Sequence, residues 1–146
     1  MLGGVSSSAA ATLTVNNNGA GVTSTFSGVL ADAGGPLSLV VMGSGQTSLQ
    51  AVNTFTGGTE VLVNASLTNA GTSGALVNRG TTTNSGTLAS LTNNTGTTTN
   101  TGTVTGATTV NGGTVNNNTG TLTGDVDVAA IGALNNQAAS NLGGNL

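Results

Sequence analysis

Apolar and threonine residues alternate with polar residues along many short segments of this chain. The segments 87–91 (TLASL) and 102–106 (GTVTG) show the pattern most clearly. Because successive side chains of a strand point to opposite faces, a period of two residues predicts β-strands. Helix is disfavoured independently, since Gly, Thr and Asn have low helix propensity whereas Thr and Val suit a pleated strand. The pattern therefore predicts an all-β chain.

Turn signals separate the alternating segments. Triplets of the form Asn-x-Gly stand at residues 69–71, 78–80, 84–86 and 100–102, and VNNNG at 15–19 uses the same residue types. Asn tolerates the left-handed region and bonds to nearby backbone, and Gly accepts a positive φ without steric cost. Each repeating unit is thus expected to be a strand, a tight turn and a second strand.

A repeat of about 16 residues organises the second half of the chain. Residues 80–95 (GTTTNSGTLASLTNNT) and 96–111 (GTTTNTGTVTGATTVN) are identical at 8 of 16 positions. A third copy lies within residues 116–124 and, after a two-residue insertion, places Asn118 and Leu122 in the same columns. A fixed period of this length is typical of one coil of a β-solenoid.

Stacked coils place equivalent residues above one another at an interstrand spacing of about 4.7–4.9 Å. Two interpretations of the recurring Asn residues stay open: exposed turn positions, or an internal ladder whose amides bond along the stack. At about 16–20 residues per coil, we expect roughly seven to nine coils and a rod about 35–45 Å long. The expected columns are an inward aliphatic one of Leu88, Val104 and Leu122 and an amide ladder of Asn84, Asn100 and Asn118.

Composition supports an ordered chain. Gly, Thr and Asn together occupy 72 of the 146 positions, and Leu, Ile, Val and Phe occupy 33. Disorder normally combines few apolar residues with high net charge, but here the formal charge is only −3. The length suits a single domain.

The same composition argues against several functional classes. Nucleic-acid binding needs cationic side chains and stacking aromatics, which one Arg and two Phe do not supply. Without Cys or His, transition-metal sites lack their usual ligands, and acid–base catalysis would rest on four carboxylates. We therefore expect no catalytic, metal-binding or cofactor-binding residues and no enzyme activity.

No segment of the sequence is predicted to span a membrane or to act as a signal peptide. The longest apolar stretch, 37–42, is far shorter than the roughly 20 residues of a membrane helix. Residues 1–11 have neither a positive region nor a long apolar run. We therefore expect either a fragment behind a start Met or a chain whose export signal has been removed.

The four acidic residues are the candidate reactive groups. Asp125 and Asp127 would share one strand face with Val126 pointing inward, but Ca²⁺ takes about 6–8 oxygen ligands, so a solvated face is preferred. Asp32 lies in the turn sequence Asp-Ala-Gly-Gly-Pro, which accounts for it. Glu60 is expected to point outward at the start of a strand. No spacing supports a carboxylate pair of Asp32 and Glu60 for glycan cleavage.

Two further patterns have a structural and a functional interpretation. The glycine-rich segments 43–45 and 57–59 lack the Lys of a phosphate-binding loop and are interpreted as turns. Threonines at two-residue spacing could form a hydroxyl-and-methyl array of the kind found in ice-binding solenoids, although β-branched residues also simply suit strands. This array covers two or three coils, is interrupted at Asn100 and Gly102, and consists of Thr81, Thr83, Thr97, Thr99, Thr103 and Thr105.

Four segments in the first half have a recognisable pattern: FSGVL at 26–30, GPLSL at 35–39, GSG at 43–45 and NTFTGGT at 53–59. Together they resemble the autotransporter-associated β-strand repeat of Gram-negative passenger regions, which commonly has Tyr where this chain has Phe55. The resemblance implies a right-handed parallel β-helix, export across two membranes, and an extracellular or bacterial outer-surface location. No catalytic residues come with the motif.

The expected organisation is a β-solenoid over residues 1–128, with the autotransporter-like repeat at about 25–67 and 16-residue repeats at about 80–128, followed by a cap or frayed tail at 129–146. The expected function is a non-enzymatic stalk or adhesive scaffold of a bacterial surface protein. The alternative is an extracellular fibre subunit that polymerises through uncapped strand edges. Expected partners are further copies of the chain, end to end or side by side, or a cell-surface glycan or protein, without nucleic acid.

Overall fold

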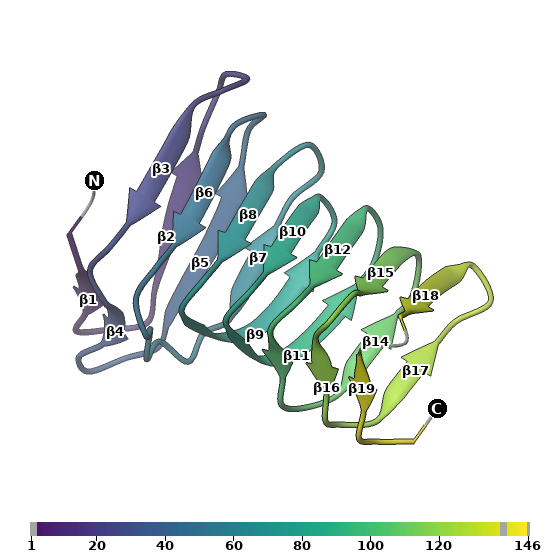
Figure 1. Cartoon of the computed structure of the whole chain (residues 1–146). Coiled ribbons are helices and arrows are strands. Elements are labelled where there is room, and N and C mark those ends of the chain that lie inside the picture. Colours follow the sequence, from purple (N-terminus) through teal and green to yellow (C-terminus); the bar gives the residue numbers. More distant parts are fainter. Residues whose placement is uncertain (1–2, 138–139, 146) are drawn as a thin grey trace.

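Parallel strands follow one another around a single winding path, as Figure 1 shows. The computed structural model describes residues 3–137 and 140–145, and within these residues it contains 19 β-strands and no helix. Accordingly, no helix in this part of the chain is long and apolar enough to cross a membrane. All strand pairings are parallel, so the predicted all-β solenoid is confirmed.

Three sheets form the walls of the solenoid. A two-stranded sheet at the N-terminal end pairs β1 (Val5–Ser7) with β4 (Leu30–Asp32). The seven-stranded sheet contains, along the rod, β3 (Thr23–Phe26), β6 (Gln46–Leu49), β8 (Ser66–Asn69), β10 (Thr81–Asn84), β12 (Thr97–Asn100), β15 (Gly113–Asn117) and β18 (Gly132–Asn136). The ten-stranded sheet contains β2 (Ala11–Asn16), β5 (Leu37–Met42), β7 (Thr59–Val61), β9 (Thr72–Asn78), β11 (Thr87–Asn93), β13 (Thr103–Val104), β14 (Thr108–Val110), β16 (Thr121–Leu122), β17 (Val126–Val128) and β19 (Asn141–Leu142).

The number of coils is smaller than the repeat length predicts. Adjacent strands of the seven-stranded sheet, from Thr23 to Ala133, are offset by 23, 20, 15, 16, 17 and 19 residues. The solenoid therefore makes about 6 turns instead of seven to nine. Six interstrand steps give a rod about 29 Å long instead of 35–45 Å. The repeat of about 16 residues holds only in the middle, because the outer coils carry longer loops.

The strict alternation predicted for residues 87–91 breaks at one point. Leu88 and Leu91 are both buried, whereas Ala89 is exposed and Ser90 is half-buried, so two outward residues follow one another. Strand β11 accordingly pairs with β13 through its first part and with β14 through its last part. The break marks a corner of the coil, which lets one strand line two walls of the interior.

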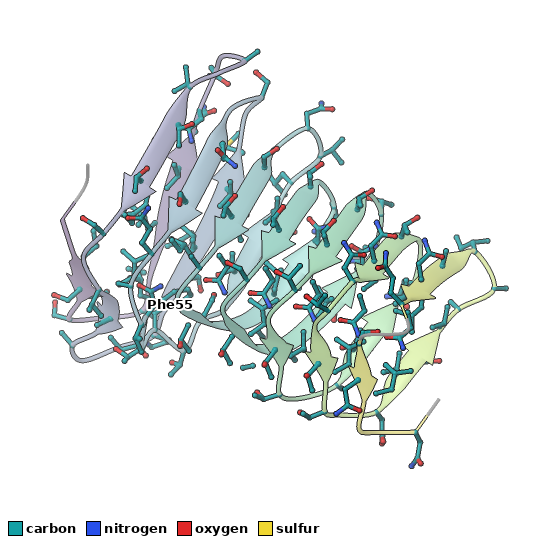
Figure 2. The ribbon with its side chains drawn as sticks, in the orientation of Figure 1. Phe55 is labelled. Atoms are coloured by element: carbon teal, nitrogen blue, oxygen red, sulfur yellow. The ribbon has the colours of Figure 1, made fainter. Side chains whose placement is uncertain are left out.

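The predicted aliphatic column is confirmed. Leu88 pairs with Val104 and Val104 with Leu122, and all three side chains are fully buried. Both Phe residues of the chain are buried as well; Figure 2 labels Phe55. The other fully buried large side chains are Leu30, Leu39, Leu49, Leu67, Leu76, Leu91, Val41, Val61 and Val110.

The end of the chain continues the sheets. Strand β18 pairs with β15 and β19 pairs with β16, so residues 132–136 and 141–142 add strands in register to the preceding coil. Within the segment 129–146, Ala138, Ala139 and Leu146 lie outside the described residues, as does the start residue Met1.

A column of glycines lets neighbouring coils approach closely at one corner. A Cβ atom placed on Gly86 would lie 1.9 Å from the carbonyl oxygen of Gly71, and one on Gly102 would lie 2.1 Å from that of Gly86. The carbonyl belongs to hydrogen-bonded backbone and cannot simply rotate away. Only glycine therefore fits this column without displacing a coil.

We expect Gly86→Ala to destabilise the protein by about 1–3 kcal/mol, the usual cost of overpacking a tightly packed site. Chemical denaturation followed by circular dichroism measures the effect. Gly74→Ala is the matched control, because a Cβ there meets its nearest atom, the Phe55 carbonyl oxygen, at an ordinary 3.4 Å. Equal stability of the two variants would show that the coils can separate without loss.

Candidate functional site

A ladder of five asparagines runs through the interior behind the seven-stranded sheet. Each Nδ2 donates a hydrogen bond to the Oδ1 of the next member, and the first four members are fully buried. The N···O distances are 2.8 Å from Asn69 to Asn84, 2.7 Å from Asn84 to Asn100, 2.8 Å from Asn100 to Asn117 and 2.7 Å from Asn117 to Asn136. Of the two interpretations left open by the sequence, the ladder is the correct one at Asn84 and Asn100.

The predicted third member was wrong by one residue. Asn100 pairs with Asn117, whereas Asn118 is half-buried and accepts a bond from Gln137 Nε2 at 3.0 Å. The two inserted residues are divided: one precedes Asn117, and the other widens the turn between Asn117 and Gly120. Sequence alignment alone placed both insertions before Asn118.

A second buried amide pair joins the two large sheets across the opposite corner. Asn78 Nδ2 donates to Asn93 Oδ1 at 2.9 Å, and Asn78 Oδ1 accepts from Thr82 Oγ1 at 3.1 Å. Thr98 Oγ1 donates to Asn93 Oδ1 at 2.9 Å. The sequence marked Asn78 only as a turn residue, although its Asn-x-Gly triplet is the signal shared with the main ladder. Hydroxyl and amide groups thus lock two neighbouring coils from inside.

The main ladder has one unsatisfied end. Asn69 Oδ1 is buried without a hydrogen-bond partner, because the residue paired with Asn69 in the preceding coil is Leu49. The bonds all run in one direction, so the first member must lack a donor. An unpaired buried acceptor costs about 1–3 kcal/mol, which the following members offset by satisfying one another.

The segment that carries the family resemblance ties adjacent coils together. Asn53 Oδ1 accepts from the Leu30 amide at 2.9 Å, while its Nδ2 donates to the Thr72 carbonyl at 3.0 Å. Gly57 packs so closely that a Cβ would lie 2.6 Å from the Leu37 carbonyl oxygen, and Gly58 has a φ of 83°. The glycines of 57–59, like Gly43 with a φ of 88°, serve as turns, as predicted.

Asp32 fastens its turn to the next coil. Its Oδ1 accepts from the Leu37 amide at 2.7 Å, and its Oδ2 accepts from the Thr56 hydroxyl at 2.6 Å and the Thr56 amide at 3.1 Å. The Thr56 hydroxyl, followed by the Leu37 amide, lowers the pKa of the Asp32 carboxyl below its ordinary value. The carboxylate is therefore a structural acceptor in the turn, as the sequence suggested.

This lowered pKa predicts an acid-sensitive contribution to folding. Asp32 stabilises the fold at pH values above its unfolded pKa of about 3.9, and the contribution is lost as the pH falls through the lower folded pKa. Asp32→Asn should be less stable than the parent chain near neutral pH, and the difference should shrink in strong acid. Denaturant unfolding across the acid range tests this, and a difference that does not vary with pH would contradict it.

The other charged groups form no compact cluster. Glu60 points outward on β7 as predicted and forms a half-exposed ion pair with Arg79, of a kind usually worth about 0–1 kcal/mol. Asp125 and Asp127 are exposed on either side of buried Val126, which matches the predicted strand face. Asp125 Oδ1 accepts from the Asn145 amide at 3.1 Å. Asp32 is hydrogen-bonded to Thr56 and Leu37, whereas Glu60 is paired with Arg79, so these two carboxylates have separate partners and do not pair with each other.

Among residues 3–137 and 140–145, no group of three or more Asp, Glu, His or Cys side chains is placed to hold a metal ion.

No protein-family model, curated protein or solved structure matches the chain. The arrangement that distinguishes this protein is therefore the hydrogen-bonded interior and the regular walls that it supports.

Proposed function

We propose that the chain is a non-enzymatic structural segment of an autotransporter-like bacterial surface protein, in which it serves as a stalk or adhesive scaffold. The observation that carries the proposal is the double ladder of the solenoid. Backbone bonds join each coil to the next, and the buried asparagines from Asn69 to Asn136 repeat the connection inside. Such a rod resists bending because any hinge would break both sets of bonds together.

The outer walls suit adhesion through many weak contacts. Hydroxyl and amide side chains project in rows, including an exposed amide pair in which Asn135 donates to Asn116 at 2.8 Å. A cell-surface glycan or another protein offers matching donors and acceptors along its length. Repeated contacts of this kind gain affinity through multivalency, since the second contact forms within an already bound pair.

The test combines location with adhesion. Protease treatment of intact bacteria that carry the protein should remove the segment if it lies on the outer surface. Deletion of the solenoid from the parent gene should reduce cell aggregation and surface attachment. A protected segment would contradict the proposed location, and unchanged adhesion in the deletion strain would contradict the adhesive role.

A second candidate function, a fibre subunit, is favoured by the two ends of the described rod. At the N-terminal end, a cavity of about 420 Å³ opens beside β2 and β3 and is lined by Leu13, Val15 and Phe26. At the other end, Ile131 is 83% exposed and the outer edge of β18 carries no further strand. Unpaired edges and apolar ends are templates for another copy of the chain.

Electron microscopy over a concentration series separates the two candidates. The fibre proposal expects long uniform filaments that vanish in Leu13→Lys, where a charge enters the end cavity. Thr12→Lys is the matched control, because Thr12 is exposed on the same strand and is not part of the cavity lining. Single rods at every concentration would exclude the fibre, whereas filaments in both variants would show that this end is not the contact.

A further inference from the structure

The outer face of the seven-stranded sheet carries two parallel ranks of short polar side chains. Its strands lie side by side along the rod in Figure 1. Ten of the fourteen positions carry a hydroxyl. The first rank is Thr23, Gln46, Ser66, Thr81, Thr97, Thr114 and Ala133, and the second is Thr25, Ser48, Thr68, Thr83, Thr99, Asn116 and Asn135.

This array differs from the one that the sequence suggested. Thr103 belongs to the ten-stranded sheet and Thr105 follows that strand, so neither joins the ranks. Asn100 points inward, and its place in the ladder removes the apparent interruption. Coils of unequal length bring in threonines from the first third of the chain, and no fixed period could have aligned these.

The threonine hydroxyls at the centre of the ranks are free for water, whereas the Thr68 hydroxyl accepts a hydrogen bond from Gln46 Nε2 at 2.8 Å. Among the described residues, the hydroxyls of Thr81, Thr83, Thr97 and Thr99 make no hydrogen bond to protein, and all four side chains are exposed or half-buried. Turn threonines behave differently: the Thr101 hydroxyl donates to the Asn84 carbonyl at 3.2 Å. None of the seven strands contains a charged residue.

The interior fixes the spacing of the ranks. The inward side chains of the same strands are fully buried and form hydrogen bonds at the two corners of the coil. These residues are Thr82, Asn84, Thr98 and Asn100. Neighbouring positions therefore repeat at about 4.7–4.9 Å along the rod and at about 6.6–6.8 Å across it, two residues apart on a strand. At each threonine position of the ranks, a methyl group stands beside the hydroxyl.

We propose that this face binds the surface of ice. A rigid, uncharged, two-dimensional array of hydroxyls orders the water on its surface with a crystal-like repeat before the protein meets ice. Little further entropy is therefore lost when that water joins the ice lattice. Charged groups would instead hold their own hydration shells. A flat crystalline polysaccharide is the competing partner for such a face, but it would be expected to use aromatic stacking, which these strands lack on their outer side. The inference goes beyond the stalk function and does not depend on it.

Thermal hysteresis of the purified chain, with partition into growing ice as a second measurement, tests the proposal. We expect hysteresis in the parent chain, its loss in Thr97→Tyr and in Thr99→Tyr, and a partial loss in Thr97→Val, which keeps the methyl group. Thr92→Tyr is the matched control, because Thr92 points outward on β11 in the other large sheet. Circular dichroism confirms that each variant is folded.

Three results would overturn the proposal. They are the absence of hysteresis and of ice partition in the folded parent chain, an equal loss in Thr92→Tyr, and binding to crystalline cellulose or chitin without binding to ice. The Thr97→Val variant keeps the test valid even if the tyrosine variants fold poorly, since the Thr97 hydroxyl makes no bond within the described protein.

Discussion

Leu88→Ala is expected to lower the free energy of unfolding by about 2–5 kcal/mol, the largest effect of any substitution considered for this fold. Leu88 is fully buried and pairs with Ser73 on one side and Val104 on the other. A serine leaves little side chain to fill the space, and the parallel backbone ladders prevent the coils from closing it. Both the lost burial and the remaining cavity therefore contribute.

Denaturant unfolding of the parent chain and of Leu88→Ala measures the difference directly. Val63→Ala is the control, because Val63 is 61% exposed and its truncation should change stability by no more than about 0.5 kcal/mol. If Leu88→Ala lowered the free energy of unfolding no more than the control does, the interior would have to collapse around the missing atoms. The backbone ladders would then not be rigid.

Asn100→Leu should also have a large effect, because it interrupts the amide ladder in its middle. Asn117 Oδ1 would lose the donor now at 2.8 Å and become the second amide oxygen of the ladder without a partner. Asn84 Nδ2 would keep the carbonyls of Gly86 and Thr103 at 3.3 and 3.4 Å. The stranded acceptor alone predicts a loss of about 1–3 kcal/mol.

Asn69→Leu is the matched control for this prediction. It removes the acceptor that is already unpaired below Leu49 and leaves Asn84 Oδ1 without a donor instead. The number of stranded acceptors stays the same, and two leucines come to stack. Asn69→Leu should therefore cost clearly less than Asn100→Leu in the same unfolding measurement. If both variants lost the same free energy of unfolding, the amide–amide bonds of the ladder would contribute no more to stability than the bonds that the Asn69 and Asn100 side chains donate to backbone carbonyls.

Local signals in the sequence were sufficient for the architecture. Alternating short segments predicted strands, and the 16-residue repeat aligned Leu88 with Val104 and Asn84 with Asn100. These assignments hold because equal coils stack without ambiguity. The prediction failed at Asn118, because one inserted residue lies before Asn117 and the other after it, and sequence identity alone could not locate the two insertions.

Only the stacking of the coils in the tertiary structure determines which side chains become hydrogen-bond partners. Asp32 lies 24 positions from Thr56 in the sequence, and the Asn78 network joins residues of two different sheets. Thr23 and Thr81 entered one rank although no common period relates them. Such contacts depend on the length of every intervening loop, and loop length carries no local signal.

By itself, the sequence determined that this chain is an all-β solenoid rich in turns, because alternation, low helix propensity and Asn-x-Gly chemistry act within a few residues. The tertiary structure decided how many coils form, which asparagines share the ladder and which threonines face outward together. The physical reason is that a parallel sheet fixes register between residues 15–26 positions apart, and only the completed stack sets those pairs.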